Sequence, residues 1–161
     1  MNLKRITPWI ALAALIAVAD QASKLAITGT LRVGEAREIT GFFNLVLAYN
    51  RGAAFSFLSD AAGWQRGLFI GIALVATGVI VALLVKHADE RLFCAGLAAI
   101  LGGALGNLWD RVALGHVVDF LDFHAFGWHF WAFNLADSAI TVGAGLLILD
   151  GLRSARRGQN N

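Results

Sequence analysis

Two long stretches without a charged side chain limit what this chain can fold into more than any other feature. Residues 67–85 and 92–109 contain no Asp, Glu, Lys or Arg, and each is long enough to cross the hydrocarbon core of a bilayer as a helix. Two further apolar runs, 8–27 and 132–149, are of similar length. Only 15% of the chain is charged, against about 25% in soluble domains. The sequence therefore predicts an all-α integral membrane protein with four transmembrane helices.

The first apolar run has a second interpretation, because it also resembles a cleavable signal peptide. Lys4 and Arg5 precede it, and Ala17-Val18-Ala19 fits the small-x-small cleavage pattern. Against cleavage, the apolar character resumes after Lys24, which gives about 20 residues in all, enough to span. Asp20 and Lys24 stand four residues apart with the acid first, which favours a structural polar pair on one helix face. We expect the first helix to be retained.

The segments between the predicted spans are polar or aromatic. Residues 28–65 have the most soluble character, and the aromatic and β-branched run at 41–49 is predicted to form a strand. Residues 110–131 are predicted to form an aromatic loop at the bilayer surface, where Trp is enriched. The sequence contains no repeat, low-complexity tract or second domain, so residues 1–161 are expected to form a single membrane domain.

Basic residues near the span ends predict the orientation. Those on one side are Lys4, Arg5, Lys86, Arg91, Arg153, Arg156 and Arg157. The positive-inside rule places that side, with both termini, in the cytoplasm, and places segments 28–65 and 110–131 outside. Topology thus explains the pI near 9.1, and no nucleic-acid partner is predicted.

Acidic and histidine side chains gather at the predicted outer end of the spans. One interpretation is a metal site; its possible ligands are Asp119, Asp122, His124, His116 and His129. They follow no recognised metal-ligand spacing, so no metal is predicted. A second interpretation is structural pairing, the usual fate of charge within a membrane. It applies to Asp20 with Lys24 and is also expected for Asp110.

Asp119 and Asp137 offer a third interpretation, a catalytic carboxylate pair. The two residues lie on different predicted elements, so only folding of the 110–131 loop over the outer end of the spans could bring them together. Two close carboxylates cannot both ionise easily and would share one proton. One could take a proton from water while the other protonates the scissile carbonyl, which is the chemistry of aspartic peptidases.

Four separated motifs resemble those of the lipoprotein signal peptidases (signal peptidase II). The motifs are Asp20-Gln21-x-x-Lys24, Asn50-x-Gly52-Ala53-Ala54-Phe55-Ser56, Gly102-Gly103-x-x-Gly106-Asn107-x-x-Asp110-Arg111-x-x-x-Gly115-x-Val117-x-Asp119-Phe120 and Phe133-Asn134-x-Ala136-Asp137. They occur in the family's order and extend over nearly the whole chain, so together they are specific.

The resemblance implies four transmembrane helices with a small extracytoplasmic β-cradle, in the bacterial cytoplasmic (inner) membrane. It implies a membrane aspartyl endopeptidase with its catalytic dyad at Asp119 and Asp137 and with no cofactor. The implied partners are membrane lipid and a prolipoprotein substrate with a diacylglyceryl-modified cysteine, whose signal peptide is cut off just before that cysteine. The residues implied to line the substrate cleft are Asn50, Asn107, Arg111 and Asn134.

The chain departs from the family at Phe130-Trp131, where members often carry Trp-Pro. This departure leaves open how the outer loop joins the fourth span, but it does not affect the dyad. The alternative from another class is a small proton- or ion-coupled transporter, which would need ionisable groups through the whole membrane depth. Residues 67–85 and 92–109 have none, which favours the peptidase.

Overall fold

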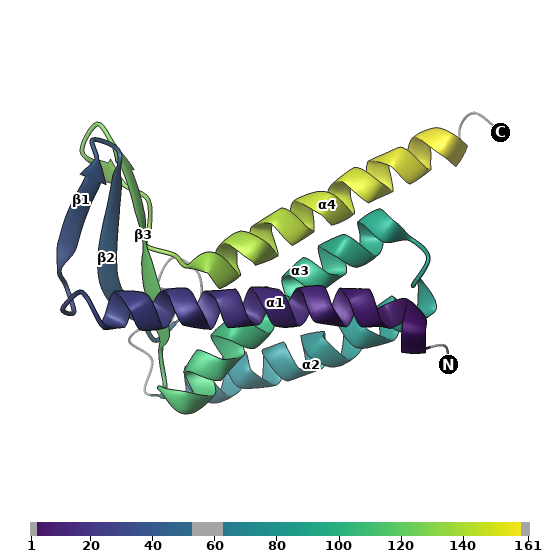
Figure 1. The fold of residues 1–161 in the computed structure, drawn as a ribbon, viewed down its shortest axis with the longest axis horizontal. Coiled ribbons are helices and arrows are strands. Elements are labelled where there is room, and N and C mark those ends of the chain that lie inside the picture. The colour runs from purple at the N-terminus through teal and green to yellow at the C-terminus, as the bar shows by residue number, and fades with distance from the viewer. Residues whose placement is uncertain (1–2, 53–62, 159–161) are drawn as a thin grey trace.

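The computed structural model describes residues 3–52 and 63–158, which form four long helices and a small sheet (Figure 1). The helices are α1 (Leu3–Thr28), α2 (Trp64–Lys86), α3 (Arg91–Ala113) and α4 (Leu135–Gly158). Each is long and apolar enough to cross a membrane. The predicted membrane architecture of four spanning helices is confirmed, and the protein is a multi-pass membrane protein.

The sheet is antiparallel and forms at one end of the helices. Its strands, hydrogen-bonded in chain order, are β1 (Ala36–Thr40), β2 (Phe43–Asn50), β3 (Val117–Ala125) and β4 (Trp128–His129). The strand predicted at 41–49 corresponds to β2. The prediction of a loop throughout 110–131 was wrong, because α3 continues to Ala113 and β3 pairs along β2. That pairing joins segments far apart in the sequence, and local patterns report such tertiary context poorly.

One glycine makes the abrupt change from α3 to β3. Gly115 has a φ of +79°, a backbone conformation that is readily available only to a residue without a Cβ. β3 therefore starts close to the end of α3 and runs back across the end of the bundle.

Helix α3 lies at the centre of the bundle, in contact with α1, α2 and α4. Its glycines allow its neighbours to come close: a Cβ on Gly102 would lie 2.6 Å from the Ala13 carbonyl oxygen of α1. A Cβ on Gly103 would overlap the Ala136 carbonyl oxygen at the start of α4. Small residues let helix backbones approach in this way within membranes. The polar part of α1 and the first turn of α4 thus meet on the surface of α3.

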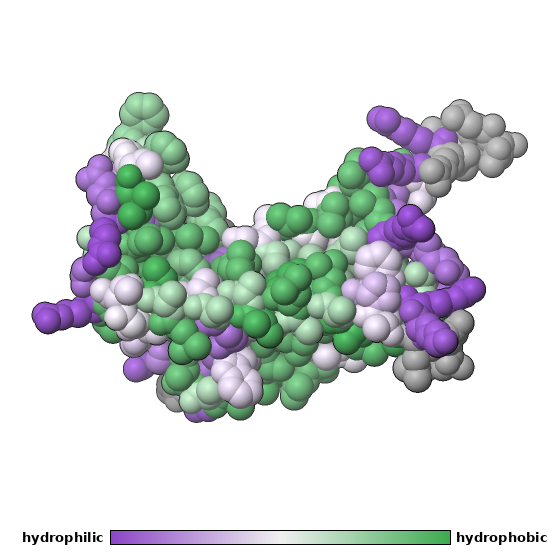
Figure 2. Space-filling view, in the orientation of Figure 1, coloured by the Kyte–Doolittle hydropathy of each residue, from purple (hydrophilic) through white to green (hydrophobic). Residues whose placement is uncertain are grey.

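The sheet is attached to the helices through its own apolar cluster. The members are Ile27, Leu31, Leu47, Val118 and Phe120. Figure 1 shows the N- and C-termini together at the opposite end of the bundle from the sheet. In Figure 2, hydrophobic surface covers the middle of the helices, and hydrophilic surface gathers near the termini and on the outer side of the sheet. This distribution is the one expected of a bundle that spans a bilayer with both termini on one side.

Candidate active site

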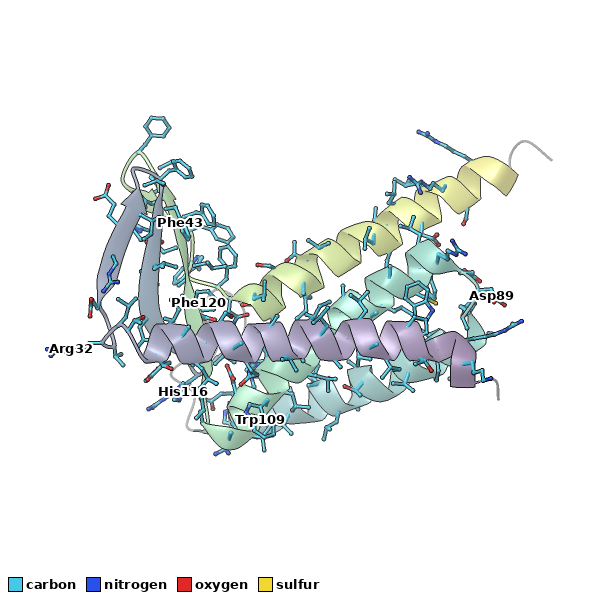
Figure 3. All side chains as sticks on the ribbon, viewed as in Figure 1. Arg32, Phe43, Asp89, Trp109, His116 and Phe120 are labelled. Atoms are coloured by element: carbon cyan, nitrogen blue, oxygen red, sulfur yellow. The ribbon has the colours of Figure 1, made fainter. Side chains whose placement is uncertain are left out.

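A cavity of about 600 Å³ lies where the sheet meets the ends of α3 and α4. Its polar lining residues are Asn50, Asn107, Arg111, Asp119, Asp137, Ser138 and Thr141. Asp119 belongs to β3 and Asp137 to the first turn of α4, so the structure brings together the two carboxylates singled out in the sequence. The segment between them comprises the rest of β3, a turn, β4 and the residues that lead into α4, in place of the loop that the sequence predicted. Phe120, the neighbour of Asp119, lies near the junction of the sheet with α4 (Figure 3).

Asp137 is held in place by the local structure that starts α4. The Asp137 backbone N–H donates to Asn134 Oδ1 at 2.9 Å, and the Asn134 backbone N–H donates to Asp137 Oδ2 at 3.3 Å. This reciprocal arrangement is a capping box, in which a side chain before the helix and one in its first turn satisfy each other's backbone donors. The Asp137 carboxylate therefore lies at a helix N-terminus, where negative charge is stabilised.

Asp119 is directed into the cavity by the alternation of β3. Its neighbours Val118 and Phe120 join the apolar cluster under the sheet, and successive side chains of a strand point to opposite faces. The Asp119 side chain receives hydrogen bonds from Asn50 Nδ2 at 3.1 Å and from Asn134 Nδ2 at 2.7 Å. Only 3% of the residue is exposed, so the carboxyl group has lost nearly all contact with solvent.

Burial of Asp119 changes its chemistry. Loss of solvent is the largest cause, followed by the negative charge of Asp137; together they raise the pKa of Asp119 from 3.8 to about 7. The hydrogen bonds from Asn50 and Asn134, and the positive charge of Lys24, oppose this rise in pKa. Asp119 can therefore carry a proton near neutral pH, when an ordinary aspartate has lost it.

Two buried amides connect the carboxylates. Asn107 Nδ2 donates to Asp137 Oδ1 at 2.8 Å, while Asn134 Nδ2 contacts both Asp119 Oδ1 and, at 3.2 Å, Asn107 Oδ1. Asp137 thus accepts a hydrogen bond from the Asn107 amide and Asp119 from the Asn134 amide, and these two amides are hydrogen-bonded to each other. The family resemblance implied that Asn107 and Asn134 line the substrate cleft; in the structure both donate hydrogen bonds to the carboxylate pair.

Arg111 lines the cavity on the side of α3. Its guanidinium donates to the Gly52 carbonyl oxygen at 3.1 Å and to the Asn107 carbonyl oxygen at 3.3 Å. It also lies over the Phe69 ring, 5.1 Å from the ring centroid, an arrangement that attracts a cation to an aromatic face. Residues 53–56, which belong to the second sequence motif, lie outside the described residues.

Sequence reasoning missed two side chains of α2 that support Arg111. Phe69 is the ring under its guanidinium, and Arg66 donates to the Arg111 carbonyl oxygen at 2.8 Å and to the Val112 carbonyl oxygen at 2.9 Å. Basic side chains commonly satisfy the last carbonyl groups of a helix in this manner. An arginine and a phenylalanine at the start of an apolar helix are ordinary in sequence, so no local signal marked them.

A buried ionic cluster lies directly behind the cavity. Lys24 Nζ is 2.7 Å from Asp20 Oδ2 and 2.8 Å from Asp110 Oδ2. The pairing expected between Asp20 and Lys24 is thus present, and Asp110 is a second partner of the same ammonium group. Asp20 Oδ1 also accepts the Ala136 backbone N–H at 2.9 Å, which joins α1 to the first turn of α4.

Apart from Asp119 itself, the possible metal ligands singled out in the sequence do not line the cavity that holds the carboxylate pair. Asp122 binds His129 at 2.9 Å and accepts a hydrogen bond from Asn44 at 2.9 Å. The His124 ring stacks on His129, and the His116 ring lies against Tyr49. Within residues 3–52 and 63–158, no three His, Cys, Asp or Glu side chains gather as a metal site would require. Phe130 and Trp131, at the departure from the family pattern, line the apolar wall of the cavity.

Comparisons with known proteins agree on one family. A family model described as signal peptidase (SPase) II matches residues 12–153. The chain is 56% identical over 151 residues to the lipoprotein signal peptidase of Paraburkholderia phytofirmans, covering 94% of this chain and 88% of that protein. It is 58% identical over 152 residues to that of Ralstonia nicotianae, with the same coverage. A solved structure described as a bacterial membrane enzyme superimposes with a TM-score of 0.84 at 33% identity, covering 93% of this chain and 90% of the other.

Proposed function

Because this chain belongs to the signal peptidase II family, we propose that Asp119 and Asp137 are the catalytic pair of an aspartic endopeptidase. The protein is a membrane protease that removes the signal peptide of lipoprotein precursors, and this activity replaces the alternative of a proton- or ion-coupled transporter. One observation carries the proposal: two carboxylates from different elements line one cavity, and the pKa of one of them is raised to about 7.

The surroundings of the two aspartates suggest different roles. Asp137 lies at the N-terminus of α4 and accepts N–H groups from Asn107 and Asn134, so its negative charge is stabilised. Asp119 retains a proton more readily, because burial disfavours its charged form. We assign Asp137 as the general base and Asp119 as the general acid.

The reaction then needs only water and the two carboxyl groups. Asp137 removes a proton from water as the water oxygen attacks the scissile carbonyl carbon, and Asp119 gives its proton to the carbonyl oxygen. When the tetrahedral intermediate collapses, the proton on Asp137 moves to the leaving nitrogen and the C–N bond breaks. Asp119 regains a proton from one hydroxyl of the intermediate, so both groups return to their starting states.

The cavity has surfaces of two kinds for the substrate. Its apolar wall includes Phe130, Trp131, Ile140 and Val142, which suits a lipid-modified residue. Arg111 and the amide side chains lie on the polar side, where they can bind peptide carbonyl groups. We propose that the substrate carries diacylglyceryl on the cysteine that follows the cleaved bond and reaches the cavity from the surrounding membrane lipid.

We also propose that the enzyme functions in the bacterial cytoplasmic (inner) membrane, with both termini in the cytoplasm and the carboxylate pair at the outer boundary. The basic residues near the termini support this orientation, as does the location of the termini opposite the sheet (Figure 1). Residues 1–161 would then act as one membrane domain, since α3 contacts all three other helices.

Purified protein mixed with two forms of one prolipoprotein tests the proposed function. The diacylglyceryl-modified form should be cut before its modified cysteine, the unmodified form should be cut far more slowly, and EDTA should have no effect on either rate. An Asp137→Asn preparation is the matched control for contaminating proteases. Equal cleavage of both forms would reject the proposed lipid requirement, and an EDTA-sensitive activity restored by zinc would reject the aspartic mechanism.

A further inference from the structure

The Lys24 ammonium group has a third partner besides its two carboxylates. Lys24 Nζ donates to Asn107 Oδ1 at 3.0 Å, in addition to its contacts with Asp20 and Asp110. An ammonium group has three N–H donors, and each of them has one acceptor here. Lys24 is only 3% exposed, so the side chain is committed to these three groups.

The contact with Lys24 determines which way the Asn107 amide points. Asn107 Oδ1 accepts from Lys24 Nζ and from Asn134 Nδ2, and Asn107 Nδ2 donates to Asp137. If the amide were flipped, its NH₂ group would face the Lys24 ammonium and its oxygen would face the Asp137 carboxylate. Both contacts would be repulsive, because the first sets one hydrogen-bond donor against another and the second sets one acceptor against another. The positive charge on Lys24 therefore keeps an N–H donor directed at Asp137.

A role in packing alone does not require a lysine at this position. Replacing a buried ion cluster by apolar residues of similar volume is often neutral or stabilising, and α1 and α3 already approach closely at Gly102. The cluster instead joins α1 and α3 to β3 and α4, the two elements that carry the carboxylate pair. Asp110 Oδ2 accepts the Val118 backbone N–H of β3 at 3.1 Å, and Asp20 accepts the Ala136 N–H of α4.

We propose that Lys24 is a positioning residue for the reaction: it fixes the Asn107 amide so that this amide orients the Asp137 carboxylate for proton transfer. The inference rests on the proposed catalytic pair. Among the hydrogen bonds of the described residues, Lys24 reaches the pair only through Asn107. Its charge also lowers the pKa of Asp119, so rates are compared at a pH below about 7, where Asp119 keeps its proton with or without Lys24. Its effect should therefore appear in kcat and disappear when Asn107 is absent.

The test is a mutant cycle in which charge is kept balanced. Lys24→Met alone would leave two buried carboxylates without a counter-ion. It is therefore combined with Asp20→Asn, so that the two substitutions together remove one positive and one negative charge. This pair of substitutions is measured with and without Asn107→Ala. The substrate is a diacylglyceryl-modified prolipoprotein at several concentrations, so that kcat and KM are obtained separately. Thermal melting in detergent verifies that each variant is folded.

The control removes a different ion pair of α1. Arg5 binds Asp89 at 2.7 Å, and Asp89 lies at the end of the bundle opposite the sheet (Figure 3). Arg5→Gln combined with Asp89→Asn is also charge-balanced, and it should leave kcat and KM unchanged.

The expected result is a specific loss of kcat. Asp20→Asn with Lys24→Met should lower kcat about 10- to 100-fold, the range that a small misplacement of a catalytic group can cause, with KM changed less than about twofold. In the Asn107→Ala background the same pair should lower kcat by less than about twofold, because coupled residues are non-additive. The inference would be overturned if the pair of substitutions lowered kcat by the same factor with and without Asn107→Ala. It would also be overturned if the pair changed only KM.

Two further measurements make every outcome decisive. If the first variant does not fold, Lys24→Met combined with Asp110→Asn is assayed, since it keeps Asp20 on the α4 backbone; failure of both to fold would assign Lys24 to folding and overturn the inference. Asp137→Asn is assayed in parallel. Turnover by Asp137→Asn would contradict the catalytic pair itself, whereas an inactive Asp137→Asn beside a normal Lys24 variant would contradict only the positioning role.

Discussion

Asp119 and Asp137 are the residues whose removal should have the largest effect. Asparagine has nearly the shape of aspartate but no titratable proton, so Asp119→Asn and Asp137→Asn should each lower kcat more than about 10³-fold while the protein still folds. The double variant should be little worse than either single one, because groups that act as a unit are non-additive. Cleavage of a modified prolipoprotein by purified protein is the measurement.

Asp122→Asn is the matched control for these two variants. Asp122 lies on the same strand as Asp119 but is paired with His129 and Asn44, outside the cavity. Its substitution should leave most of the activity. Substantial turnover by either dyad variant would falsify the assignment of the pair.

The raised pKa of Asp119 predicts how both activity and stability depend on pH. Activity should fall as pH rises above about 7, because Asp119 then loses the proton that it must donate. Stability should change with pH in the opposite direction to that caused by an aspartate whose pKa is lowered on folding. The folded state holds the Asp119 proton between pH 3.8 and about 7 whereas the unfolded state does not, so stability decreases as pH rises through this range.

Asp119→Asn removes that pH-dependent loss of stability. The variant should therefore melt at a higher temperature than the native protein at pH 8, and the difference should shrink as pH is lowered toward 4. Melting curves of both proteins in the same detergent over this pH range are the measurement. A difference that is the same at every pH would show that the proton on Asp119 is not its source.

At the level of helices and strands, local sequence patterns predicted some features and missed others for physical reasons. The four helices are visible because hydrocarbon requires long apolar segments, a property of each segment by itself. Strand β3 was missed because its residues pair with β2 from the other end of the chain. Asp119 and Asp137 stood out as charges near apolar spans. Their approach to each other was not predictable from spacing, since it depends on that pairing and on the Asn134 cap of α4.

Close packing of α3 on α4 should be as important as the polar contacts. A Cβ on Gly103 would overlap the Ala136 backbone beside Asp137, and backbone cannot move aside as a flexible side chain can. Gly103→Ala should destabilise the protein by about 1–3 kcal/mol, as overpacking typically does, and should lower kcat by shifting the start of α4. Thermal melting and cleavage rates would reveal both effects.

Gly145→Ala, at a position of α4 that packs against no other helix, is the control for this variant. No atom lies within 4 Å of the position that a Cβ on Gly145 would occupy, and alanine favours a helix over glycine by up to about 1 kcal/mol. It should melt at the same temperature or higher and retain full activity. Equal behaviour of the two alanine variants would mean that α4 can move away from α3 without loss.

For the molecule as a whole, the orientation in the membrane is the main prediction. A reporter that works only in the cytoplasm should be active when it is fused after Asn161. A reporter that works only in the periplasm should be active when it is inserted between β1 and β2, after Gly41. The reason is the excess of basic residues near the ends of the helices that carry the termini. Periplasmic activity of the C-terminal fusion would reverse the proposed topology.

Retention of the first helix is a second prediction at this scale. The α1 side chains Asp20 and Lys24 contact α3 and α4 behind the cavity. Cleavage after Ala19 would remove the part of α1 that packs on α3 at Gly102 and would leave Asp20 and Lys24 without the helix that positions them. The intact mass of protein purified from membranes should therefore include residues 1–19. A mass that corresponds to cleavage after Ala19 would establish the signal-peptide interpretation instead.

The hydrogen bond between Asp20 and the Ala136 N–H also bears on how the enzyme is made. A ribosome synthesises α1 first and α4 last, yet the Asp20 carboxylate of α1 accepts a backbone donor in the opening turn of α4. The nascent chain therefore cannot assemble the proposed catalytic pair, which includes Asp137 of α4, until α4 has entered the bilayer. Products of interrupted translation that lack α4 should be inactive, so that the cell gains the protease only from chains that include α4.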